Sequence, residues 1–91
     1  MMMMIDDDRV SVPVSELSAQ DIGHVGVKDI GQIIDYRIRQ EGNRVIHTID
    51  LGGGSYLSIT YSDRGDVLAT EPKGVRFERL GESLFVMKDS E

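Results

Sequence analysis

Residues 31–62 read GQIIDYRIRQEGNRVIHTIDLGGGSYLSITYS, and this stretch decides the fold of the chain. Gly42-Asn43 is a two-residue turn signal between two stretches of alternating apolar and polar residues. Three consecutive glycines, Gly52 to Gly54, separate the second stretch from a third that begins at Ser55. The pattern predicts three antiparallel strands joined by two tight turns.

The Gly42-Asn43 turn also fixes how the first two strands pair. Counting outward from it gives the facing pairs Ile38–His47, Tyr36–Ile49 and Ile34–Leu51. A slip of one residue would set Thr48 and Asp50 against the apolar side chains, so the turn and the hydrophobic pattern agree on one register. This register predicts two groups of side chains: Ile34, Tyr36 and Ile38 point into the core, and Ile33 and Ile46 point outward with Arg37 and Arg39.

The remaining chain carries only short elements. Val10, Val12 and Val14 alternate with polar residues and Pro13, which indicates an edge strand or a strand at a bulge. Ser18 and Asp21 have the spacing of a capping box, and Gly23 ends that helical turn. We further expect strands at 24–27, 67–70, 75–80 and 84–87, with a turn at Glu71-Pro72-Lys73-Gly74.

These short strands predict an all-β fold, a small antiparallel SH3-like or OB-like barrel with one short helical turn. Barrel closure would remove the edges that such strands otherwise expose. We expect one domain over residues 9–88, a disordered acidic N-terminal tail over 1–8 and a C-terminal tail over 89–91.

Composition limits the functions available to the chain. The 91 residues include no cysteine, which excludes disulfides, thiolate metal ligands and a catalytic thiol. The net charge is −6, but five of the 16 acids lie in the tails, which leaves 11 acids against 10 bases in residues 9–88. Nucleic-acid binding is therefore disfavoured, because it needs a basic face. No signal peptide or membrane span is apparent, and we expect a cytoplasmic protein.

One segment resembles a known group of proteins. The run Leu17-Ser18-Ala19-Gln20-Asp21-Ile22-Gly23, then Gly31-Gln32-Ile33 and Val75-Arg76-Phe77, resembles small SH3-like barrel proteins of actinobacterial phages and mobile elements. Their opening usually continues with Lys after Asp-Ile-Gly, where this chain has His24. The resemblance implies a fold and a setting, the cytoplasm of a phage host, and it implies no catalytic residues.

No group of residues points to an enzyme. His47 lies on the apolar face of its strand, where a hydrogen-bonded structural histidine is the more common case. His24 has Asp21 and Asp29 near it in sequence, but a third metal ligand is not marked. Arg64-Gly65-Asp66 has the composition of an ordinary turn. We expect no catalytic residues, no metal and no cofactor.

The glycine run allows a ligand-binding alternative. The backbone amides of Gly52, Gly53, Gly54 and Ser55 could hold a small nucleotide-like ligand together with Arg44 or other nearby arginines. A strand follows these glycines instead of the helix and lysine of a P-loop, so a plain turn is the simpler interpretation.

Several strands have adjacent apolar residues, such as Val45-Ile46 and Tyr56-Leu57, which would make both faces apolar. If loops and tails do not cover the second face, another chain does. We therefore predict a non-enzymatic protein-binding accessory factor of phage type, which engages a host protein and can in addition self-associate through an outer sheet face. The expected contact residues on the outer face are Ile33, Arg37, Arg39, Ile46 and Tyr56.

Overall fold

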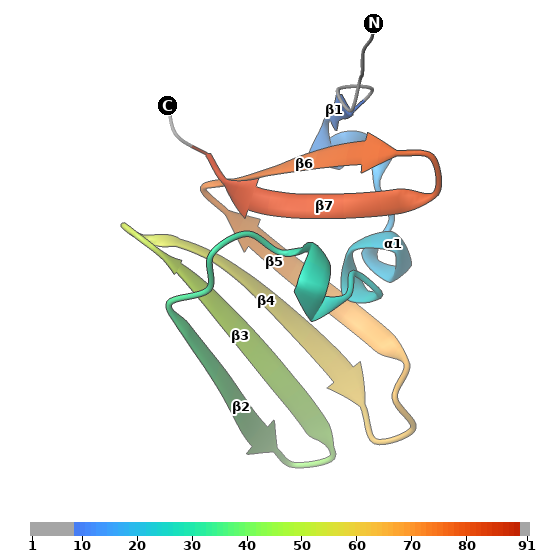
Figure 1. Ribbon diagram of the computed structural model, residues 1–91. Helices are drawn as coiled ribbons and strands as arrows, with labels where there is room; N and C mark the ends of the chain where they lie inside the picture. Colours follow the sequence, from blue (N-terminus) through green and yellow to red (C-terminus); the bar gives the residue numbers. More distant parts are fainter. Residues whose placement is uncertain (1–8, 90–91) are drawn as a thin grey trace, which may run out of the picture.

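The computed structural model describes residues 9–89, which form seven strands, one short α-helix and two 3₁₀ turns (Figure 1). In chain order the elements are β1 (Val10–Val12), η1 (Val14–Glu16), α1 (Ala19–Gly23), η2 (Val27–Asp29), β2 (Asp35–Glu41), β3 (Arg44–Gly52), β4 (Ser55–Ser62), β5 (Val67–Lys73), β6 (Val75–Leu80) and β7 (Ser83–Lys88). The predicted all-β class is confirmed. The predicted tail at 1–8 lies outside the described residues.

The larger sheet has four antiparallel strands in the order β2-β3-β4-β5. Its first hairpin turns at Gly42, whose φ of 63° is the left-handed conformation that glycine adopts without strain. The pairs Tyr36–Ile49 and Ile38–His47 have the register predicted from this turn. The second hairpin turns at Gly53 and Gly54, also as predicted.

The predicted turn at Glu71-Pro72-Lys73-Gly74 is wrong, because β5 continues to Lys73 and pairs Pro72 with Leu57. Pro72 cannot donate to a ladder, but β5 is an edge strand with an open side that needs no donor. Gly74 alone separates β5 from β6, with a φ of 64°. The chain bends there from the larger sheet into the smaller one.

The smaller sheet has three antiparallel strands in the order β1-β6-β7. In Figure 1, β6 and β7 lie across the upper end of the larger sheet, and the lower ends of β2 and β3 extend beyond them. The helix α1 contacts β5, and η2 contacts β7. The larger sheet is therefore covered over only part of its length.

The predicted capping box forms at the start of α1. The Asp21 backbone N–H donates to Ser18 Oγ, and the Ser18 backbone N–H donates to Asp21 Oδ2, both at 3.1 Å.

The predicted strand at 24–27 is wrong: this segment is irregular and leads into the 3₁₀ turn η2. Glycines at 23 and 26 leave too short an apolar alternation to hold a strand. No helix in residues 9–89 is long and apolar enough to cross a membrane.

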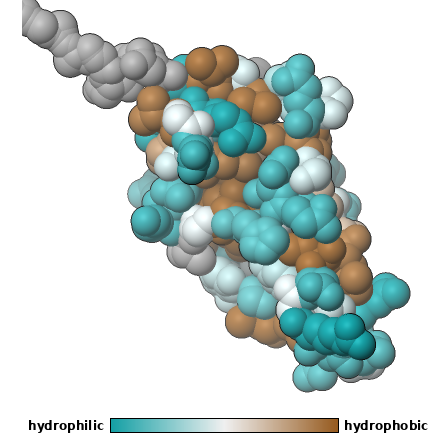
Figure 2. All heavy atoms as spheres, turned by 90° about the vertical axis from the view of Figure 1, so that its right-hand side faces the viewer, coloured by the Kyte–Doolittle hydropathy of each residue, from teal (hydrophilic) through white to brown (hydrophobic). Residues whose placement is uncertain are grey.

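The core lies between the two sheets and α1. Its buried apolar side chains are Ile22, Ile30, Ile49, Leu51, Leu57, Ile59, Val67, Phe77, Leu84 and Val86. Gly23 lets α1 approach the sheet, since a Cβ at this position would lie 2.5 Å from Val67 Cγ2. In Figure 2, which views the molecule from the right of Figure 1, brown apolar patches are separated by teal polar ones.

The prediction that Ile34, Tyr36 and Ile38 fill the core is wrong. Tyr36 and Ile38 lie on the core side of the larger sheet, since Tyr36 pairs with buried Ile49, but the three side chains are 67%, 39% and 64% exposed in order. Tyr36 and Ile38 are exposed because β2 is an edge strand that the covering elements do not reach, and Ile34 lies in the segment before β2. Ile33 was expected to point outward, but it precedes β2 and packs against the core.

Candidate functional site

Among residues 9–89, no element packs over part of the core-side face at the end of the larger sheet that carries the Gly42-Asn43 turn. Strand pairing sets Ile38 opposite His47 and Val45 opposite Tyr61 on this face, next to Tyr36. Ile38 and Tyr36 are exposed, and the other three are half-buried. We call these five residues the uncovered face: Tyr36, Ile38, Val45, His47 and Tyr61.

Three rings of the uncovered face are in contact. The Tyr36 hydroxyl and His47 Nδ1 are 2.8 Å apart and share a hydrogen bond. The His47 ring centroid lies 5.8 Å from that of Tyr36 and 4.9 Å from that of Tyr61, both edge to face. The His47 ring is thus both hydrogen-bonded and packed against two neighbouring rings. Aromatic contacts of this kind hold the three side chains in place.

The uncovered face is also hollowed. A hollow of about 410 Å³ is lined by Val45, His47, Tyr61, Ser62, Asp63 and Gly65. Burial, with a smaller effect of nearby Tyr36, raises the pKa of Tyr61, so its hydroxyl stays neutral. This surface therefore combines aliphatic and aromatic area with a few polar groups, and the Asp63 carboxylate lies at the margin of its hollow.

A second hollow, of about 420 Å³, lies on the opposite, outer face of the larger sheet. It is lined by Arg37, Thr48, Asp50, Gly52, Gly53, Gly54, Tyr56, Ser58 and Glu71. It brings together two residues of the predicted partner-binding set, Arg37 and Tyr56, with the three glycines of the predicted ligand-binding set. The sequence analysis singled out neither Asp50 nor Glu71. Glu71 reaches the hollow through the pairing of β5 with β4, which was not predicted.

Several polar groups of this second hollow already have partners. The Gly52 backbone N–H donates to Asp50 Oδ1 at 2.8 Å, and Arg37 Nη1 donates to Asp35 Oδ2 at 2.8 Å. The Tyr56 hydroxyl donates to Glu71 Oε2 at 3.0 Å, and this bond raises the pKa of Tyr56. Two carboxylates at the hollow disfavour a phosphate group.

The other predicted site residues do not join this hollow. Ser55 is buried, with 5% of its surface exposed, and the Gly74 bend packs against its hydroxyl. Arg44 lies at the opposite end of β3 from the glycine turn. Ile46 is on the outer face next to Arg39, as predicted, but it is half-buried and the other outer-face residues of β3 are polar. The predicted pair of outward aliphatic residues, Ile33 and Ile46, is therefore reduced to Ile46 on this sheet.

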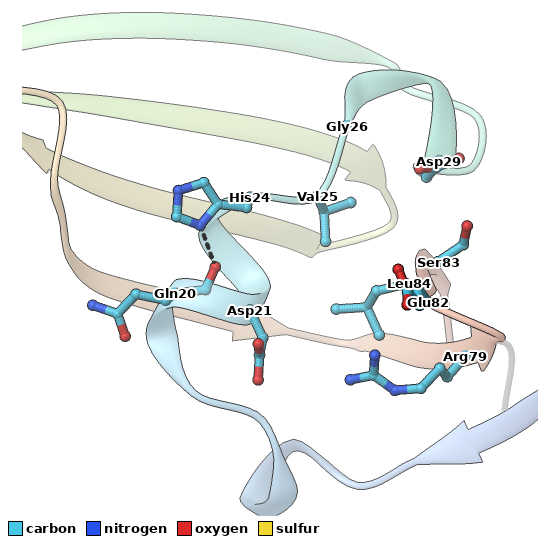
Figure 3. Close-up of a pocket in the computed structure, with 10 residues that line it drawn as sticks. All are labelled: Gln20, Asp21, His24, Val25, Gly26, Asp29, Arg79, Glu82, Ser83 and Leu84. Carbon is cyan, nitrogen blue, oxygen red and sulfur yellow. Dashed lines mark hydrogen bonds between the residues drawn. The ribbon is translucent and has the colours of Figure 1, made fainter.

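A third hollow, of about 360 Å³, lies between α1 and the β6–β7 hairpin (Figure 3). Figure 3 shows the Asp21 carboxylate and the Arg79 guanidinium on the same side of it, with His24 and Asp29 apart from each other. Hydrogen bonds from Ser18, with a smaller effect of Arg79, lower the pKa of Asp21. His24 Nδ1 donates to the Gln20 carbonyl oxygen at 2.7 Å. Within residues 9–89, no three histidine or acidic side chains are grouped to hold a metal ion.

Comparisons of the chain with models of protein families, with curated proteins and with solved structures returned no match.

Proposed function

We propose that this chain is a non-enzymatic protein-binding module and that the uncovered face is its contact surface. The observation that carries the proposal is the exposure of Ile38, which is 64% exposed on the core side of an edge strand, next to Tyr36 at 39%. An apolar face of this kind beside a free strand edge is typical of surfaces that bind another chain. The surface replaces the outer face that the sequence suggested.

The composition and packing of the face support this role. Aromatic side chains are enriched at the centres of protein interfaces, and Tyr36 and Tyr61 are already fixed by contacts with His47. Full burial of a large apolar side chain contributes about 1.5–3 kcal/mol, so Ile38 with one or two neighbours is enough to anchor a partner.

The resemblance to small barrel proteins of actinobacterial phages and mobile elements supports the setting. With it we propose an SH3-like relationship for the two-sheet fold, a phage-type accessory role, and a host protein in the host cytoplasm as partner. A role of this kind needs no catalytic group and no cofactor.

The test is capture of proteins from an extract of the native host with matched variants. Ile38→Asp places a charge on the uncovered face, and Leu68→Asp is the control, because Leu68 is 47% exposed on the opposite edge strand β5. We expect a protein that binds the wild-type chain and Leu68→Asp but is lost from Ile38→Asp. Equal capture by all three chains would refute the proposal.

A second candidate function is binding of a small ligand in the outer hollow, favoured by the way Arg37, Tyr56 and the three glycines meet there. The carboxylates of Asp50 and Glu71 match a neutral, hydroxyl-rich molecule better than a nucleotide. Titrations with glucose and with ATP, followed by the NMR signals of Gly53 and Tyr56, test this candidate and its ligand class.

A further inference from the structure

The charges along the free edge of β2 follow a symmetric pattern. Asp35, Arg37, Arg39 and Glu41 occupy alternate positions, so they lie on the outer face in the order acid, base, base, acid. Each arginine pairs with the acid next to it on the same face, Arg37 with Asp35 at 2.8 Å and Arg39 with Glu41 at 3.0 Å. All four side chains are more than half exposed, and exposed pairs of this kind exchange partners at little cost.

In the part of the chain that the structure describes, β2 pairs with β3 alone, and the backbone groups on its other side can pair with another strand. The two-residue turn makes Glu41–Arg44 the hydrogen-bonded closing pair, and bonds to β3 then recur at every second residue. The amides of Tyr36, Ile38 and Gln40 therefore face the open edge. The Tyr36 N–H donates to the Asp35 carboxylate at 2.9 Å and not to β3, in agreement with this alternation.

A second copy of β2 fits this edge badly. Antiparallel pairing centred on Ile38 engages the whole strand, but it sets Arg37 against Arg39 of the other copy and Asp35 against Glu41. Like charges directly opposite each other destabilise a sheet. If the second copy is shifted along the edge so that its arginines face Asp35, fewer residues of the two β2 strands pair. The charge pattern therefore works against self-association through this edge.

We infer that β2 accepts an extended segment of a different protein, with acidic residues opposite Arg37 and Arg39, basic residues opposite Asp35 and Glu41, and apolar or small residues between them. The intervening side chains continue the uncovered face beside Tyr36 and Ile38. Because the charge pattern reads the same in both directions, the match holds for a parallel or an antiparallel segment. This inference rests on the proposed function and names the chemistry of the partner.

The test uses two synthetic peptides of identical composition, acetylated and amidated at their ends to remove the terminal charges. The matching peptide is Lys-Thr-Glu-Val-Glu-Thr-Lys, and the control is Glu-Thr-Lys-Val-Lys-Thr-Glu. Each is titrated to millimolar concentration into the isotope-labelled full chain, and the amide NMR signals of Ile38 and Gln40 are followed. We expect the matching peptide to bind about tenfold more tightly, since each cross-strand charge pair contributes a small part of the difference.

Variants of the four exposed charges make the test specific. Arg37→Glu with Arg39→Glu should erase the preference, because each peptide then has two matched and two opposed pairs. Adding Asp35→Lys and Glu41→Lys to this double variant should invert the preference, so that the control peptide binds more tightly. The fourfold variant keeps the net charge of the wild-type chain and an acid–base pair at each of the two positions within β2. Ile38→Pro should abolish binding of the matching peptide, because it removes an edge-facing N–H without removing a bond to β3.

The outcomes separate this inference from the proposed function. Equal binding of the two peptides, or no binding of either, overturns the inference, whereas capture that depends on Ile38 would still support the proposed function. Sedimentation of the chain at increasing concentration gives a further test. If the wild-type chain self-associates and the variant with Arg37→Glu and Arg39→Glu does not, the inference is overturned, because a second copy would then occupy the edge.

Discussion

The Tyr61 hydroxyl on β4 donates a hydrogen bond to the Gly23 carbonyl oxygen at the end of α1, 3.0 Å away. The same glycine packs directly against Val67 of β5. One polar and one apolar contact therefore fix α1 on the larger sheet. Tyr61 is also where cover by α1 ends and the uncovered face begins, so this bond joins the folded core to the proposed contact surface.

Removal of the Tyr61 hydroxyl tests this connection. Tyr61→Phe should lower the free energy of unfolding by about 1 kcal/mol, because a partly buried carbonyl loses its donor. Tyr56→Phe is the matched control, since its hydroxyl bonds to the exposed Glu71 side chain, which water can solvate instead. Urea unfolding measures both, and an equal loss in the two variants would contradict the structural role of Tyr61.

The bend at Gly74 offers a test of close packing between the two sheets. Gly74 and Gly42 have nearly the same φ, 64° and 63°, but a Cβ at position 74 would lie 2.7 Å from Ser55 Oγ, and at position 42 it would meet nothing within 4 Å. Gly42→Ala should cost about 1 kcal/mol from backbone strain alone. Gly74→Ala should cost clearly more. Thermal melts of the two variants compare them, and equal melting temperatures would show that the sheets can separate at the bend without cost.

The capping box of α1 predicts a dependence of stability on pH. The pKa of Asp21 is lower in the folded chain than in the unfolded chain, so ionised Asp21 stabilises the fold above its unfolded pKa, near 4, and this contribution is lost as pH falls through the folded pKa. Asp21→Asn should thus lower stability at pH 7 and match the wild type near pH 2.

Ser18→Ala is the companion variant for the capping box. It removes the acceptor of the Asp21 backbone N–H, a bond that does not depend on the carboxylate charge. It should cost about 1 kcal/mol at both pH values. Chemical unfolding at the two pH values measures the pair of variants, and a cost of Asp21→Asn that persists at low pH would mean that the carboxylate charge is not what stabilises the cap.

Two aspartate substitutions distinguish core from surface on the same sheet face. Ile59 is 3% exposed and Ile38 is 64% exposed. Ile59→Asp should unfold the chain, because it buries a charge without a partner, whereas Ile38→Asp should keep the β spectrum in circular dichroism and lose less than about 1 kcal/mol. Loss of the fold in Ile38→Asp would mean that the uncovered face is buried in the monomer.

The sequence gives the local elements well where turn and cap chemistry act alone. Gly42-Asn43 predicts the β2–β3 register correctly, and Ser18 with Asp21 predicts the helical turn and its two reciprocal bonds. Prediction from the sequence fails at Pro72, because only the position of β5 at the edge of the sheet makes a proline acceptable there.

The register of β3 with β4 also cannot be predicted from the sequence. A regular ladder that starts from the Gly52–Ser55 pair would place Val45 opposite Ser62, but an irregularity between Asp50 and Gly52 places Val45 opposite Tyr61.

By itself the sequence determined the all-β class, the two glycine turns, the absence of thiol chemistry and the side of the sheet on which Tyr36 and Ile38 lie. It could do so because these properties depend on the conformational freedom of glycine, on composition and on the two-residue period of a strand. Only the tertiary structure decided which residues of that face are covered. Burial depends on where β6, β7 and α1 come to lie and on the place of each strand in the sheet. Ile59 and Ile38 are alike in type and in strand periodicity, but Ile59 lies on the internal strand β4 beneath the covering elements and Ile38 lies on the edge strand β2.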